Sequence, residues 1–544
     1  MGWRKGACIV LILAPLAVSP ARGAEAPPFD WSGFYAGYHL GGALDLVDVD
    51  DPFGPSIFGD IVRTPGPLAG GQIGYNWQRG AGLLGFEADI SFADLDGTNT
   101  CFAFSGNYIS ANCRAEIDAL GTIAGRLGWI LPSDGRTLLF GKAGLAWAHG
   151  DIDAKPNGGL GLPGTSDDGV TWGWTVGAGV ERAITPRWTA KAEYGFLSFD
   201  EDFAAPSSRF QSAPPLGPLA AFPGSRTDLS QNLHQFKLGM NYKLGATQGA
   251  EQRPRSAGDP ARRYALTAGL RYVHGWGQFH KDLGIPFRGV SSLASRLTYD
   301  NTSIDGGEAF ARLDTPFGLM VKGLVGGATS GGKLNDEDWA LPFPTAFVPY
   351  SNTLSRVDND IDYGIIDAGY DVWRGAGYSV APFIGYSRFE QDMTGIGCVQ
   401  LANRFSDCVP SLPNNLRAIT EDDTWEALRL GAVADVTITP RVNLTAEAAY
   451  LPYVKFRGVD DHLLRNLVSP EHGEGTGVQL EAALSYAVTD ALSLGVGGRY
   501  WSMWTTSGNV NFGGTGTIVP MRYAAEQAHL LVQGSYKFGF APAP

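Results

Sequence analysis

The sequence predicts an all-β fold: two transmembrane antiparallel β-barrels of about eight and ten strands, joined by a periplasmic linker. Segments of about ten residues alternate apolar with small or polar side chains, the period of two expected for strands with one face toward lipid. The connections between these segments alternate short and long, as periplasmic turns and outer loops do in bacterial barrels. After the N-terminal signal, no run approaches the ~20 uninterrupted apolar residues that a membrane helix needs.

The first 23 residues predict a secretory signal peptide. Arg4 and Lys5 precede an apolar run from Ala7 to Val18, and small residues offer a cleavage site after Gly23. We therefore expect an exported chain, located in the outer membrane of a Gram-negative cell and in contact with its lipids.

Charged residues on the inner strand face favour a barrel over a soluble β-sandwich, which alternation alone would also fit. Such charges are costly to bury in a sandwich core, whereas a barrel lumen can hydrate or pair them. In the C-terminal half they are Arg271, Arg429, Asp435, Glu447 and Arg499.

Eight alternating segments precede residue 246 and ten follow residue 262. Because both numbers are even, each set can close on itself with both ends in the periplasm. Residues 246–262 are polar, contain two prolines and lack periodicity, as a linker would. The predicted domains are a signal peptide (1–23), an eight-stranded barrel (28–245), the linker (246–262) and a ten-stranded barrel (263–540). The alternative is one eighteen-stranded pore, with the linker as a long periplasmic turn.

The composition favours a membrane barrel and excludes one class of partner. The 74 glycines and the 62 aromatic residues (28 Phe, 20 Tyr and 14 Trp) suit tight barrel walls and interfacial aromatic girdles. The net charge of −14 argues against a nucleic-acid partner, which would require a basic surface. Long outer loops are expected over residues 43–66, 97–115, 150–169, 200–231, 281–294, 329–353, 393–423, 459–474 and 506–521.

Two cysteine pairs fall within single predicted outer loops, Cys101 with Cys113 and Cys398 with Cys408. An exported protein meets an oxidising periplasm, so two local disulfides are expected; free thiols are the alternative. Neither pair has the spacing of a metal site with nearby histidines.

The N-terminal half opens with Trp31-Ser32-Gly33-Phe34-Tyr35 and closes on residues 238–244, LGMNYKL. On these strands, residues 28–245 resemble the eight-stranded, porin-like immunogenic outer-membrane proteins of alphaproteobacteria. Eight strands leave little more than side-chain room in the lumen, so a filled, structural barrel is expected. The inward residues expected to fill it are Arg126, Lys142, Glu181, Lys191 and Glu193.

The C-terminal half carries two acidic motifs in predicted outer loops: Asp336 with Asp338, and Asp460 with His462. If the loops face each other across the mouth, the histidine is a natural general base near neutral pH, and Asp460 can orient it. The other two carboxylates can hold the attacking water and share a proton. An acidic Asp-x-Asp loop is more often solvated surface, as expected for residues 358–360 and 421–423.

Residues 263–540 resemble the omptins, ten-stranded outer-membrane endopeptidases. The resemblance rests on Gly331-Gly332 before Asp336-Glu337-Asp338-Trp339, on Asp460-Asp461-His462 with Arg465, and more weakly on residues 293–299. It implies that Asp336 and Asp338 position water, that Asp460 orients the base and that His462 is the base. The sequence departs from the family where omptins carry an acidic specificity residue, because position 458 is glycine. For the second acidic specificity group, the first strand offers Gln278, His280 and Asp282 without a secure match.

The resulting expectation is an aspartic-type endopeptidase acting on extracellular peptides or proteins, without metal or organic cofactor. The family resemblance, and no other feature of the sequence, implies lipopolysaccharide as an activating lipid. The alternative is a non-enzymatic outer-membrane surface barrel, adhesin-like or porin-like.

Overall fold

A computed structural model gives the fold of the 544-residue chain. The structure describes residues 29–52, 58–102, 111–132, 135–156, 164–206, 208–211, 219–222, 224–245, 264–287, 290–338, 351–375, 377–402 and 408–540. The predicted signal peptide, the predicted linker and Trp339 lie outside them. No helix among the described residues is long and apolar enough to cross a membrane.

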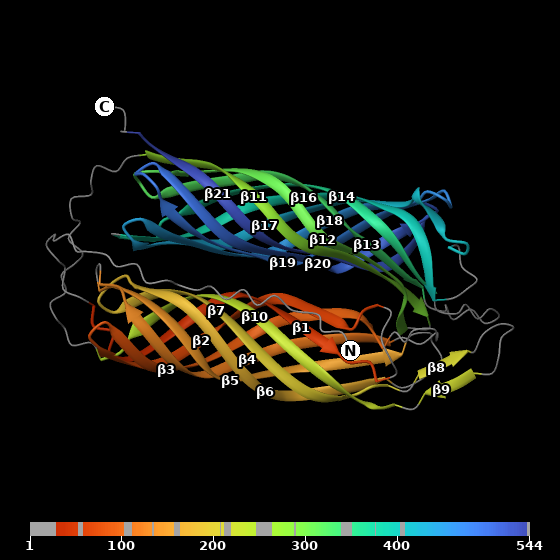
Figure 1. The fold of residues 1–544 in the computed structure, drawn as a ribbon, viewed down its shortest axis with the longest axis horizontal. Helices are drawn as coiled ribbons and strands as arrows, with labels where there is room; N and C mark the ends of the chain where they lie inside the picture. Colours follow the sequence, from red (N-terminus) through yellow and green to blue (C-terminus); the bar gives the residue numbers. More distant parts are fainter. Residues whose placement is uncertain are drawn as a thin grey trace.

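Eight antiparallel strands form a closed N-terminal barrel, in the order β1-β10-β7-β6-β5-β4-β3-β2 (Figure 1). A separate hairpin, β8 with β9, lies within the connection from β7 to β10. The strands are β1 (Gly33–Val49), β2 (Ile61–Arg79), β3 (Gly82–Cys101), β4 (Ala111–Ile130), β5 (Thr137–Pro156), β6 (Thr165–Ala183), β7 (Trp188–Ala204), β8 (Ser208–Gln211), β9 (Leu219–Phe222) and β10 (Arg226–Lys243).

The C-terminal strands form a second antiparallel sheet, which β14 closes by pairing with β16. Among the described residues of this half, ten strands are long, as predicted, and a three-residue strand, β15, is added at one turn. They are β11 (Tyr264–Phe287), β12 (Val290–Asp314), β13 (Leu319–Asp338), β14 (Ser351–Tyr370), β15 (Trp373–Gly375), β16 (Tyr378–Ala402), β17 (Leu412–Thr439), β18 (Val442–His462), β19 (Leu467–Ala487), β20 (Leu492–Phe512) and β21 (Thr517–Phe540). The eighteen-stranded alternative is wrong, since the two halves pair separately.

Both lumens contain the predicted charges, which are paired. In the N-terminal barrel, Lys142 and Lys191 both contact Glu193, at 2.5 and 3.1 Å, and Arg126 contacts Glu181. In the C-terminal barrel, Arg499 lies 2.6 Å from Glu308. Similar pairs there join Arg271 to Glu308, Arg312 to Asp435, and Arg429 to Asp367 and Glu447. Pairing offsets the cost of placing these charges out of bulk water.

The lipid-facing belt occupies the periplasmic half of the C-terminal strands. On β20, Leu492, Leu494 and Val496 point outward and are 38–59% exposed. Farther along, the outward positions become polar, as at Asp358 and Asp360 on β14. The strands therefore continue above the membrane as a tall barrel.

Because the strands continue above the membrane, two of the predicted outer loops are shorter than expected. Residues 459–474 were expected to form a loop, but β18 runs to His462 and β19 starts at Leu467, leaving four residues between them. The connection predicted over 506–521 likewise shrinks to residues 513–516. Both predicted disulfides, Cys101–Cys113 and Cys398–Cys408, are present.

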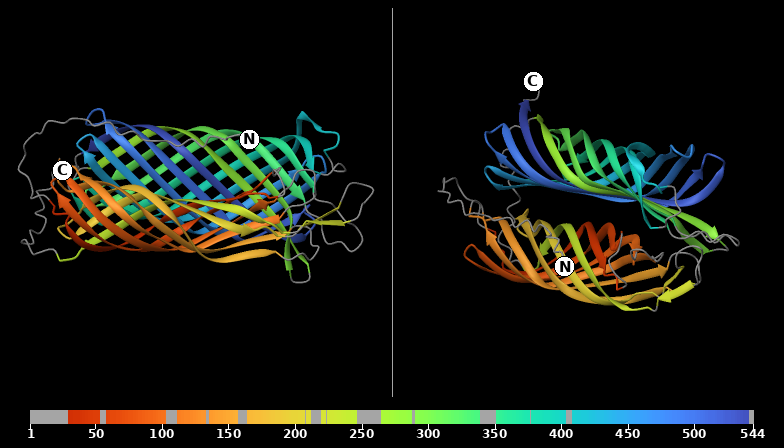
Figure 2. Two further views of the ribbon diagram at one scale, coloured as in Figure 1. Left: turned by 60° about the horizontal axis from the view of Figure 1, so that its bottom comes forward. Right: turned by 45° about the vertical axis from the view of Figure 1, so that its right-hand side comes forward.

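The two barrels lie side by side, with β1 and β2 against β18 and β19 (Figures 1 and 2). At the periplasmic end, the hydroxyl of Tyr378 donates to the carbonyl of Ile184 at 3.2 Å. At the outer end, the hydroxyl of Thr100 donates to Glu337 at 2.7 Å. Both barrels therefore point the same way, as two barrels in one membrane must.

Candidate active site

The predicted carboxylates Asp336 and Asp338 lie at the C-terminal end of β13. They lie on strand rather than in a loop, which corrects the sequence expectation. Residues two apart on a strand share a face, and the inward positions of β13 include buried Met320 and Leu334. Asp336 and Asp338 therefore point into the mouth of the barrel, with Asp336 half-buried and Asp338 exposed.

The second predicted pair, Asp460 and His462, ends β18 and also faces inward, continuing the row of Val454 and Phe456. The Nε2 atom of His462 lies 3.2 Å from Oδ2 of Asp460. Burial alone would lower the pKa of His462, but the hydrogen bond and the negative charge of Asp460 outweigh it and raise the pKa above 6.5. Asp460 thus orients His462 and stabilises its protonated form.

The Asp336/Asp338 pair and the Asp460/His462 pair lie close enough for their charges to interact. Limited hydration and the neighbouring charge of Asp338 raise the pKa of Asp336, while His462 and Arg465 oppose that rise. The two carboxyls therefore hold a shared proton more readily than isolated aspartates would. Arg465, in the turn after β18, acts on both of them.

Two further residues of the site escaped the sequence prediction. Lys281 on β11 is fully buried, and its Nζ lies 3.1 Å from the same Oδ2 of Asp460 that contacts His462. Burial alone would raise the pKa of Asp460, but Lys281 and His462 outweigh it and lower the pKa. Ser295, paired in register with Asp338, hydrogen-bonds that carboxylate. Neither contact could be predicted from the sequence, because each depends on how strands far apart in the chain are paired.

The structure also places two groups of residues that the sequence singled out less firmly. Gln278, His280 and Asp282 lie on the outer face of β11, because Phe279 and Lys281 are the inward residues, and Asp282 binds Arg296 at 2.6 Å. Residues 421–423 are not simply solvated surface, because Glu421 and Asp423 face the lumen and are 0% and 2% exposed. Residues 358 and 360 are exposed, as expected.

The N-terminal barrel contacts the outer side of this site. Glu337, between the two aspartates, points outward and is buried against Thr100. Arg296, next to Ser295, donates to Asn112 at 2.8 Å and to Thr100 at 3.0 Å. The strand ends that carry Ser295, Asp336 and Asp338 are thus fixed from outside by the other barrel.

Comparison with known proteins identifies the family. The profile described as "Outer membrane protein beta-barrel domain" matches residues 8–243. The 22 kDa outer membrane protein of Rhizobium leguminosarum bv. viciae is 31% identical over 191 residues, which are 34% of this chain and 75% of that protein. The chain belongs to the outer-membrane β-barrel family. This places the protein in the outer membrane.

This outer-membrane β-barrel protein is also similar to an immunogenic protein and, more distantly, to a solved protease structure. The 31 kDa outer-membrane immunogenic protein of Brucella melitensis biotype 1 is 29% identical over 245 residues, covering 42% of this chain and 92% of the relative. Among solved structures, the outer membrane protease OmpT of Escherichia coli is 14% identical, with a TM-score of 0.43, covering 51% of this chain and 98% of that one. At these values the OmpT match carries no argument about activity.

Proposed function

We propose that the C-terminal barrel of this outer-membrane protein is an omptin-like, aspartic-type endopeptidase that hydrolyses extracellular peptides or proteins at its outer mouth. The observation that carries the proposal is the hydrogen-bonded pair of His462 and Asp460 within electrostatic reach of Asp336 and Asp338. A histidine held by a carboxylate, facing a proton-sharing carboxyl pair, is suited to activating water.

The chemistry needs no covalent intermediate. With its Nε2 proton donated to Asp460, neutral His462 has Nδ1 free to accept a proton from water while the oxygen attacks the peptide carbonyl. The shared proton of Asp336 and Asp338 can hydrogen-bond the water or the developing oxyanion. Protonated His462 then gives its proton to the leaving amine, which regenerates the neutral base.

A second candidate is a non-enzymatic surface barrel. The relatives support it, since those named are an immunogenic protein and a 22 kDa outer membrane protein. The filled, ion-paired lumen of the N-terminal barrel also suits a structural or surface role. The two candidates differ in whether residues 336, 338, 460 and 462 do chemistry.

The deciding experiment is cleavage of a diverse peptide library by the refolded full-length protein, with lipopolysaccharide present, read by mass spectrometry. The endopeptidase proposal expects internal cleavage that Asp336→Asn abolishes. Asp358→Asn, an exposed aspartate on the outer face of β14, is the matched control and should leave cleavage unchanged. A library that stays intact with folded protein supports the surface-barrel candidate.

A further inference from the structure

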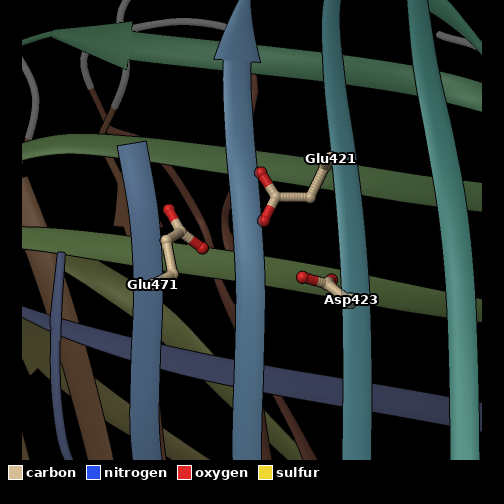
Figure 3. Close-up of side chains that lie close together, drawn as sticks. All are labelled: Glu421, Asp423 and Glu471. Carbon is tan, nitrogen blue, oxygen red and sulfur yellow. The ribbon is translucent and has the colours of Figure 1, made fainter. Parts of the chain in front are cut away.

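Below the candidate active site, the lumen contains three carboxylates that the proposed peptidase chemistry does not use. Glu421 and Asp423 extend from β17 and Glu471 from β19, and Figure 3 shows them converging across β18. One oxygen from each lies within 4.8 Å of the others. Oxygens bound to one Ca²⁺ are each about 2.3–2.6 Å from it, hence at most ~5 Å apart, so this spacing fits a single ion.

The charges in this cluster do not balance. Lys281 contacts Glu421, and lies 3.0 Å from Glu471 and 3.1 Å from Asp460. One ammonium therefore serves three carboxylates, and Asp423 adds a fourth whose described contact is the amide of Gln391 at 3.1 Å. Buried carboxylates in such excess must be protonated or bound to a cation.

Unpartnered polar atoms face the cluster. Among the described residues, no group donates to Glu421 Oε1, Asp423 Oδ1 or Glu471 Oε2. Glu421 lies within hydrogen-bonding reach of the other two carboxyls, which only a shared proton or a cation can join. The hydroxyl of Tyr299 likewise has no partner within the described part of the chain and is 0% exposed, and it lies close enough to Lys281, Glu421 and Asp423 for their charges to act on it. An unpartnered hydroxyl in a native interior requires an explanation, such as a missing ligand.

Gly458 allows the carboxylates of this cluster to lie close to the backbone of β18. It lies on β18 between Asp423 and Glu471, in register with both. A Cβ at this position would be 2.7 Å from Asp423 Oδ1, 2.9 Å from the Phe456 ring and 3.2 Å from Glu471 Oε2, so a side chain here would displace both oxygens. The cluster is enclosed, because the three carboxylates are at most 2% exposed. It suits an ion better than a substrate side chain.

We propose that Glu421, Asp423 and Glu471 bind one oxygen-preferring divalent cation, of the class of Ca²⁺ or Mn²⁺, inside the C-terminal barrel. Three carboxylate oxygens and a nearby hydroxyl form a hard donor set of the kind such ions take. The cation site does not depend on the proposed peptidase activity, although Lys281 contacts both groups of carboxylates. It departs from the sequence expectation that no metal is bound.

Protonation is the competing account. Burial and the charge of Glu421 raise the pKa of both Asp423 and Glu471 well above their usual range. Two protons could therefore neutralise the cluster in place of the ion. The two accounts differ in whether a metal binds near neutral pH.

Terbium luminescence separates them. The full-length protein is refolded in detergent without lipopolysaccharide, which itself binds divalent cations, then treated with chelator and titrated with Tb³⁺ at pH 7 under tryptophan excitation. Trp425, fully buried and two residues from Asp423, is the expected sensitiser. The proposal expects saturable emission with one ion per chain, displaced by Ca²⁺ and lost in Trp425→Phe.

Two variants and a control complete the test. Asp423→Asn should weaken Tb³⁺ binding at least tenfold, and so should Gly458→Ala, whose methyl group displaces the oxygens without removing a carboxylate. The double variant Asp358→Asn/Asp360→Asn removes exposed carboxylates of β14 and should bind as the wild type does. Folding is checked by the heat-shifted mobility of barrels on gels. Absence of saturable emission, or equal binding by folded Gly458→Ala, would overturn the proposal in favour of protonation.

Discussion

Replacing Asp460 with asparagine tests the role of the carboxylate behind the proposed base. The substitution keeps the shape of the side chain but removes the charge 3.2 Å from Nε2 of His462. An amide can also present its N–H to the ring and favour the wrong tautomer. The expected consequence is a lower kcat with little change in KM, because the interaction strengthens as His462 becomes protonated in the transition state.

The magnitude follows from the geometry. Coulomb's law with an effective dielectric constant of about 20 gives about 5 kcal/mol for unit charges 3.2 Å apart. At 1.36 kcal/mol per tenfold, this corresponds to a loss of roughly 10³- to 10⁴-fold in kcat. Lys281 stays in the variant and would repel protonated His462, so it does not offset the loss.

The assay is steady-state cleavage of the best peptide from the library, with Asp461→Asn as the matched control. Asp461 is the adjacent carboxylate, but it lies on the outer face of β18 and should leave kcat within about twofold. If kcat falls less than tenfold in Asp460→Asn, and no further than it does in Asp461→Asn, the assigned role of Asp460 is refuted.

Three other predictions follow from the same contacts. The rate should rise with pH as His462 loses its proton, with a midpoint above 6.5, and fall again as the shared proton of Asp336 and Asp338 leaves; a pH–rate profile flat from pH 5 to 9 would contradict both assignments. Because the pKa of Asp336 is raised in the folded state, its ionisation costs stability as pH rises through that pKa, so Asp336→Asn should raise Tm more at pH 9 than at pH 5; an equal shift at both values would count against the charge pair. Asn112→Ala, in the other barrel, removes the 2.8 Å bond from Arg296 and should lower kcat several-fold while both barrels stay folded, whereas Asn99→Ala should have no effect; unchanged kcat in Asn112→Ala would mean that the N-terminal barrel does not hold the site in place.

Sequence patterns were sufficient for the architecture because a barrel wall repeats one rule along every strand. The alternation around Glu447 and Arg499 placed these charges inside, where each is paired. The ends of strands were harder to predict. Above the membrane both faces of β18 and β19 become polar, so the strand through Asp460 and His462 resembled a loop.

The candidate site could be predicted only as far as local motifs reach. Asp460 and His462 lie two residues apart, and strand geometry alone puts them on one face. Lys281 contacts Asp460 from 179 positions away, and which side it faces depends on the register of β11. The acidic run around Glu421 was expected to be solvated because composition does not report burial.

Cleavage by the refolded protein should depend on His462, so the rate at which it cleaves its best library peptide is compared with the rate of His462→Ala. The control is His472→Ala, an exposed histidine on the outer face of β19. We predict that His462→Ala reduces cleavage roughly 10³-fold or more, while His472→Ala cleaves as the wild type does. Cleavage by His462→Ala at the wild-type rate, or no cleavage of any peptide by folded wild-type protein, would contradict this prediction.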